Sequence, residues 1–171
     1  MKERTGVVTF QGNPLTLLGD EIGSGDKAPG FETIGNDMAP VSFSSFRGKV
    51  CVISSVPSLD TPVCDLETRK FNENAVGLGE DTVVLTISMD LPFAQKRWCG
   101  AAGVERIKTL SDHRDGAFGL AYGVLIKELR LLSRAVFVVD RDGIVQYVQL
   151  VKEITNEPDY DAVWSAVRKL A

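Results

Sequence analysis

The sequence predicts an α/β fold in which helices flank a mixed central sheet. A strand, a helix and a second strand follow one another between residues 50 and 89, which is the pattern of a parallel βαβ unit. Residues 135–139 (Ala-Val-Phe-Val-Val) are apolar at every position, so both faces of this strand must be covered. The parallel βαβ unit and the strand that is apolar on both faces together indicate a sheet buried between layers of helix.

The N-terminal part is expected to contain short strands only. Alternating apolar residues around the turn Gln11-Gly12-Asn13-Pro14 predict a β-hairpin over residues 7–18. Several glycines then mark a loop, and residues 31–35 predict a further short strand.

The βαβ unit has the clearest boundaries. Residues 50–56 are short and β-branched, as expected of a buried strand. The helix begins with Thr61 as N-cap and Pro62 at the first helical position, where its missing N–H costs nothing. Residues 82–89 alternate in polarity and predict the second strand.

The second half completes the fold. The expected elements are a helix from Pro92 to Gly100, a minor strand at 107–111, a helical turn at 117–122, a strand at 135–139, a tight turn at 140–143, an antiparallel strand at 144–150 and a closing helix from Asp159. A βαβ unit followed by a β-hairpin and a terminal helix is the order of a thioredoxin-like fold. At about 100 to 200 residues per domain, residues 1–171 form a single domain.

Composition and charge limit the partners. The chain is 44% hydrophobic and 25% charged with a net charge of −4, which argues against nucleic acid or an anionic membrane surface as partner. No apolar run approaches the ~18 residues of a membrane span, and the start lacks the apolar core of a secretory signal. We therefore expect a cytoplasmic protein.

The cysteines indicate transient rather than structural disulfides, because they are only three and odd in number. Cys51 lies within a strand and is expected to be an inert core thiol. The sequence Trp98-Cys99-Gly100 is how a thioredoxin active site begins, but the second cysteine is missing. The three cysteines and His113 lack the paired spacing of a zinc site, so we expect neither a metal nor an organic cofactor.

Cys64 occupies the third position of the predicted helix, where backbone N–H groups lack helical partners and the helix dipole favours a thiolate. The Thr61 hydroxyl is expected within hydrogen-bond reach of the sulfur or its substrate. From this geometry alone, a small packed cysteine is equally consistent with the sequence.

A longer pattern separates the two interpretations. Residues 57–64 have the spacing P-x-x-x-T-x-x-C, which resembles the active-site loop of the peroxiredoxins. Residues 54–64, together with residues 69–72, 89–95 and 134–138, resemble the bacterial thiol peroxidase subfamily in the same order.

This resemblance implies a thiol-dependent peroxidase that reduces hydrogen peroxide and small organic hydroperoxides. It implies that Cys64 is the peroxidatic cysteine and that Cys99 resolves its sulfenic acid as an intrachain disulfide. Arg134 would lie beside the catalytic sulfur, with Thr61 and Pro57 shaping the pocket. Thioredoxin is the implied reductant, and a homodimer is the implied working form.

Two other functions remain open on the sequence. In a redox-responsive interaction protein the same disulfide would act as a switch for a partner. In a binding module with idle thiols, Cys99 would be a core residue beside Trp98, and Arg134 an exposed side chain at a strand end.

Overall fold

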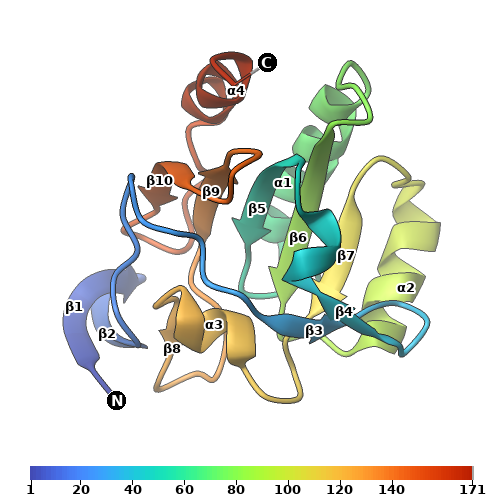
Figure 1. Ribbon diagram of the computed structural model, residues 1–171. Helices are drawn as coiled ribbons and strands as arrows, with labels where there is room; N and C mark the ends of the chain where they lie inside the picture. Colours follow the sequence, from blue (N-terminus) through green and yellow to red (C-terminus); the bar gives the residue numbers. More distant parts are fainter. Residues whose placement is uncertain (171) are drawn as a thin grey trace.

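The computed structural model describes residues 1–170 and shows, within them, a seven-stranded mixed sheet and a separate three-stranded sheet (Figure 1). The strands are β1 (Glu3–Phe10), β2 (Asn13–Leu18), β3 (Glu32–Ile34), β4 (Pro40–Ser42), β5 (Val50–Ser55), β6 (Thr82–Ser88), β7 (Lys108–Ser111), β8 (Leu125–Ile126), β9 (Ala135–Val139) and β10 (Val145–Leu150). The helices are α1 (Pro62–Ala75), α2 (Pro92–Ala102), α3 (Ala117–Ala121) and α4 (Tyr160–Arg168), with a 3₁₀ turn at Phe43–Phe46. None of these helices is long and apolar enough to cross a membrane.

The main sheet has the order β10-β9-β5-β6-β7-β3-β4. β5 pairs parallel to β6, and β6 pairs parallel to β7. In each case a helix, α1 or α2, returns the chain to the end of the sheet at which the preceding strand began. On its other side β5 pairs antiparallel to β9, which forms a hairpin with β10. The predicted βαβ unit and the mixed sheet are confirmed.

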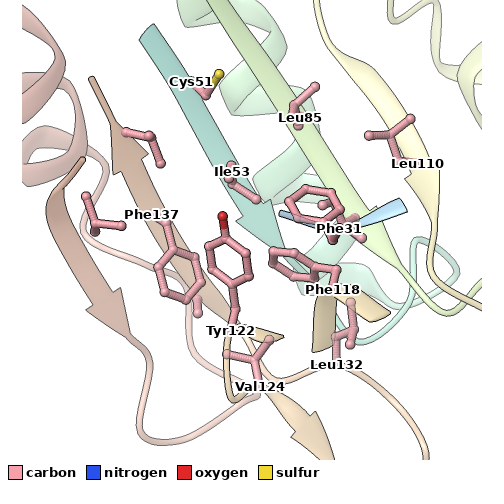
Figure 2. Packing of buried hydrophobic residues seen from close by; sticks show 14 of the residues in the cluster. Phe31, Cys51, Ile53, Leu85, Leu110, Phe118, Tyr122, Val124, Leu132 and Phe137 are labelled. Carbon is pink, nitrogen blue, oxygen red and sulfur yellow. The ribbon is translucent and has the colours of Figure 1, made fainter. Parts of the chain in front are cut away.

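Alternate residues of the central strands divide into two cores. On one face Val52 of β5 and Val138 of β9 pack with Phe71 of α1 and Trp164 of α4. On the other face lies an aromatic cluster, in which Phe118 and Tyr122, from α3 and its end, pack on strand residues (Figure 2). This period-two division explains why residues 135–139 are apolar throughout.

The N-terminal hairpin is confirmed, with a longer first strand than predicted. Its turn places Gln11 and Gly12 at positive φ (50° and 82°), as a tight hairpin turn requires. The hairpin pairs through β2 with β8, a two-residue strand that the sequence does not signal. Strand β3 lies within the predicted residues 31–35, whereas β4, which pairs with it, is unpredicted.

The predicted end of α2 is wrong. Gly100 lies inside the helix, which continues to Ala102. The left-handed residue that ends it is Gly103, with φ 66° and its N–H bonded to the Cys99 carbonyl. A glycine inside a helix costs only about 1 kcal/mol relative to alanine, so α2 continues through Gly100.

Glu153 ties the tip of the hairpin to the loop after β10, and this tie should depend on pH. Its carboxylate accepts from the N–H of Gly12 (2.9 Å) and from Thr155 and Thr9. These bonds, led by the one from Gly12, lower the pKa of Glu153 from 4.5 to about 2. The folded pKa is the lower one, so the stabilisation is present above the unfolded pKa and is lost as the pH falls from about 5 to 2.

We expect carboxyl NMR to give Glu153 a titration midpoint of about 2. The difference in Tm between the protein and its Glu153→Gln variant should shrink over the same pH window. A midpoint near 4.5, or a Tm difference that does not change with pH, would contradict the tie.

Candidate active site

Cys64 lies where the chain leaves the carboxyl end of β5 and enters α1. Thr61 precedes the helix in extended backbone (φ −100°, ψ 147°), and Pro62 is its first residue, as predicted. Cys64 is therefore in the first helical turn, whose N–H groups have no partner within the helix. Its side chain is fully buried and packs with Val56 and Leu59 of the preceding loop.

Arg134 contacts the Cys64 sulfur directly. The pairing of β5 with β9 places Ala135 opposite Ser55, so Arg134 lies one residue beyond the sheet, beside the loop that leads to Cys64. Its Nη2 donates to Cys64 Sγ at 3.3 Å, and the side chain is almost entirely buried. A charged donor at this distance in a dry pocket stabilises a thiolate more than a thiol.

The guanidinium of Arg134 is held in place from two sides. Nη1 forms an ion pair with Glu67, which is completely buried, while Nε and Nη2 donate to the Ile154 carbonyl at 3.0 and 2.8 Å. The other oxygen of Glu67 accepts from Ser54 at 3.0 Å. The orientation of Arg134 toward the sulfur is therefore fixed by α1, β5 and the loop after β10.

The charges of this buried pair depend on each other. Burial raises the pKa of Glu67, and Arg134 and Ser54 act against that rise. Burial alone would lower the pKa of Arg134, but Glu67 and Cys64 outweigh it, so the pKa is raised and the guanidinium stays charged. Glu67 was not singled out in the sequence, although it lies three residues after Cys64 and hence on the same face of the helix.

Of the two partners expected for the Thr61 hydroxyl, the sulfur and its substrate, the sulfur is not bonded to it. Its hydroxyl donates to the Ser58 carbonyl at 2.7 Å and makes no side-chain capping bond. Thr61 is exposed whereas Cys64, three residues further on, is buried. Pro57 is buried in the loop between β5 and α1.

Asp90, after β6, fastens this loop from the neighbouring strand. Its carboxylate accepts from the Ser58 hydroxyl at 2.7 Å, from the Leu59 N–H at 2.8 Å and from the Ser88 hydroxyl at 2.7 Å. Because Leu59 packs on Cys64, Asp90 indirectly shapes the sulfur pocket.

Cys99 is near the C-terminal end of α2 and is half-buried. Its sulfur lies 3.3 Å from Thr109 Oγ1 on β7, and Thr109 donates its own hydrogen to Asn36. The Cys99 thiol is therefore the donor to Thr109. The neighbour of Cys99 on α2, Trp98, packs against the small apolar cluster formed by Cys64, Val56 and Leu59. All three cysteines are free thiols.

Cys51 belongs to the aromatic core at the opposite end of β5 (Figure 2). Burial raises its pKa to about 12, so the thiol stays protonated. Among residues 1–170, no three His, Cys, Asp or Glu side chains lie together in a way that could hold a metal ion.

This fold, with a buried cysteine and arginine in contact at a helix start, matches known proteins over almost its whole length. Residues 23–164 match the Redoxin family model. The chain is 58% identical to the thiol peroxidase of Halalkalibacterium halodurans, over 94% of this chain and 96% of that one. It is 53% identical to the thiol peroxidase of Bacillus subtilis, over 95% and 97%.

A solved structure agrees with these relatives. The crystal structure of a peroxiredoxin-like protein from Aquifex aeolicus superposes with a TM-score of 0.91 at 46% identity, covering 98% of each chain. The thioredoxin-like fold class predicted from the sequence is confirmed. The chain belongs to the Redoxin family and, within it, to the bacterial thiol peroxidases, which are oxidoreductases of the peroxiredoxin type.

Proposed function

We propose that this chain, acting as one domain, reduces hydrogen peroxide and small organic hydroperoxides through Cys64, and that Cys99 resolves the product as an intrachain disulfide. The observation that carries the proposal is the 3.3 Å contact between Arg134 Nη2 and the Cys64 sulfur inside a fully buried pocket. A thiolate needs such a fixed cation to persist away from water.

In the first step the Cys64 thiolate attacks the terminal peroxide oxygen. An S–O bond forms, the O–O bond breaks, and the other oxygen leaves as water or alcohol after taking up a proton, so Cys64 becomes a sulfenic acid. Arg134 uses four of its five N–H groups on Ile154, Glu67 and Cys64, which leaves one on Nη1 for a peroxide oxygen. The Thr61 oxygen, having donated its hydrogen to Ser58, can only accept, as the hydroxyl of a peroxide requires.

In the second step Cys99 attacks the sulfur of the Cys64 sulfenic acid. The S–S bond forms, the S–O bond breaks, and water leaves with the proton from Cys99. Thioredoxin, a dithiol, then reduces the disulfide and is itself oxidised. We place this cycle in the cytoplasm, because reduced thiols persist in a reducing compartment.

The test is to treat the fully reduced protein with one equivalent of hydrogen peroxide, quench it after a few seconds with an alkylating agent in denaturant, so that buried thiols also react, and map the thiols by mass spectrometry. We expect two thiols to be lost, Cys51 to be alkylated and one linked peptide to join Cys64 to Cys99. Repeated turnover with thioredoxin and its reductase separates an enzyme from a redox-responsive switch. Three alkylated cysteines would refute the proposal.

The homodimer is also part of this proposal, and the start of α2 offers a surface for it. Leu91 and Phe93 are 53% and 66% exposed, which is unusual for large apolar side chains on either side of a helix start. We expect the protein to sediment as a dimer and Phe93→Asp to shift it toward monomer.

The matched control is Leu129→Asp, which places the same charge on another exposed leucine, after β8. This variant should remain dimeric. A wild-type protein that sediments as a monomer at all concentrations would contradict the dimer, and equal dissociation of both variants would contradict its location.

A further inference from the structure

Asp65 joins the two helices that carry the reactive cysteines. Its carboxylate accepts from the indole Nε1 of Trp98 on α2 at 2.7 Å and from Nε of Arg69 on α1 at 3.0 Å. Asp65 directly follows Cys64, and Trp98 directly precedes Cys99. One hydrogen-bonded cluster thus lies beside both thiols.

Arg69 extends this cluster to the end of α2. Its Nη1 donates to the Ala102 carbonyl at 3.4 Å, and its guanidinium carbon lies 5.7 Å from the centre of the Trp98 ring. Ala102 is in the last turn, where carbonyls have no helical partner. We call Asp65, Arg69 and Trp98 the Asp65 latch, because together they hold the C-terminal half of α2 against α1.

The two halves of α2 are anchored differently. In the first half Gln95 is completely buried and its amide donates to Ser88 and to the Leu110 carbonyl. The buried residues of α2 are confined to this half. The second half is held by the Asp65 latch and by the bond between Cys99 and Thr109. It can therefore detach while Gln95 keeps the first half in place.

The arrangement of Trp98 and Cys99 prevents a disulfide while the Asp65 latch is closed. Trp98 packs against the cluster that contains Cys64, and Cys99, about 100° further around the helix, bonds to Thr109 on β7. A disulfide requires the two Cα atoms to lie within about 7 Å with their side chains facing each other. Trp98 must leave the surroundings of Cys64 before Cys99 can occupy its place.

We propose that Asp65, Arg69 and Trp98 are positioning residues that set how fast Cys99 reaches oxidised Cys64. This inference rests on the proposed peroxidase cycle. While the latch is closed, the sulfenic acid stays in the pocket, where a second peroxide can transfer an oxygen to the sulfur and leave as water or alcohol, giving a sulfinic acid. When the latch opens, Cys99 can form the disulfide before a second peroxide reacts. The strength of the contacts in the Asp65 latch therefore sets the ratio of turnover to overoxidation.

Asp65→Asn and Trp98→Phe weaken the same bond in different ways. The first removes the carboxylate charge and keeps an acceptor, and the second removes the N–H and keeps an aromatic ring. Asp65→Asn also removes a negative charge beside the helix start, and this change affects the peroxide step. Trp98→Phe leaves the charge unchanged. An effect common to both variants is therefore an effect of the latch.

The measurement is rapid mixing of reduced protein with peroxide, followed by an alkylating quench and mass spectrometry of Cys64. In each variant we expect the sulfenic acid to convert to disulfide about fivefold faster, as for a lost hydrogen bond to a partly exposed charge. Excess peroxide should leave a smaller sulfinic fraction than in the wild type. The effects of the two substitutions should not multiply in the double variant, because both act on one bond.

Glu73→Gln is the matched control, since it removes an exposed carboxylate from the same helix without touching α2. It should leave both the rate and the partition unchanged. In a Trp164→Phe background, Trp98 is the sole indole, and its fluorescence should change at the same rate as the disulfide forms.

The outcomes separate the two proposals. If the wild type forms no linked peptide between Cys64 and Cys99, the proposed cycle fails. If it does, but Asp65→Asn and Trp98→Phe resolve at the wild-type rate or more slowly, the latch does not limit resolution and the inference is wrong. Circular dichroism identifies a variant that does not fold, and the other single variant then decides the question.

Discussion

Replacing Arg134 by methionine should lower kcat/KM for peroxide by about a hundredfold to a thousandfold, the loss typical of removing one fixed donor from a reacting charge. Methionine has nearly the length of the arginine side chain but cannot donate to the Cys64 sulfur. The thiolate would lose its neighbouring cation, and the peroxide would lose the free N–H on Nη1. Stopped-flow kinetics over a range of peroxide concentrations measures this loss.

The same substitution should also destabilise the fold by about 3–5 kcal/mol, because it leaves Glu67 buried without its partner. Activity could then fall merely because the protein unfolds. The double variant Glu67→Gln/Arg134→Met distinguishes the causes, since it contains no unpaired buried charge. We expect urea unfolding to show that it regains most of the stability, while its kcat/KM stays low. Recovery of both would mean that Arg134 acts through folding alone.

Local signals explain why the βαβ unit could be predicted. Proline at the first helical position, a preceding threonine and alternating strands act within a few residues of one another, so they fix Cys64 in the first turn of α1. The end of α2 was misplaced, because Gly100 and Gly103 are equivalent in the sequence and only the backbone decides which is left-handed. Strands β4 and β8 form by pairing with β3 and β2, which lie elsewhere in the chain, so their own two or three residues do not reveal them.

The side chains around Cys64 depend on long-range register, which explains what the sequence could not show. Arg134 is seventy positions from Cys64 and meets it only because β9 pairs with β5. Resemblance to a family could suggest that proximity, but periodicity could not. Glu67 and Asp65 look like ordinary helix charges, and their importance follows from partners on other elements, Arg134 and Trp98. For Thr61 the position before the helix is confirmed, and its hydroxyl hydrogen goes to the Ser58 carbonyl rather than to the sulfur.

Replacing Cys99 by serine should abolish steady-state peroxidase activity with thioredoxin while leaving the first reaction intact. Serine keeps a hydroxyl that can donate to Thr109, so α2 should stay in place and Cys64 should still react with peroxide at the wild-type rate. Without a second thiol no disulfide can form. Rapid consumption should stop after about one equivalent of peroxide per chain, and excess peroxide should then use a second equivalent to carry Cys64 to the sulfinic acid.

Cys51→Ala is the control for this experiment, because it removes a thiol that burial keeps protonated at the far end of β5. It should retain both the first reaction and sustained turnover. Mass spectrometry of Cys64 after each addition of peroxide follows the oxygens gained. If Cys99→Ser turned over like the wild type, thioredoxin would be reducing the sulfenic acid directly, and α2 would need no opening. If sustained turnover is lost in Cys99→Ser, the disulfide is required, and the C-terminal half of α2 must separate from α1 in every cycle.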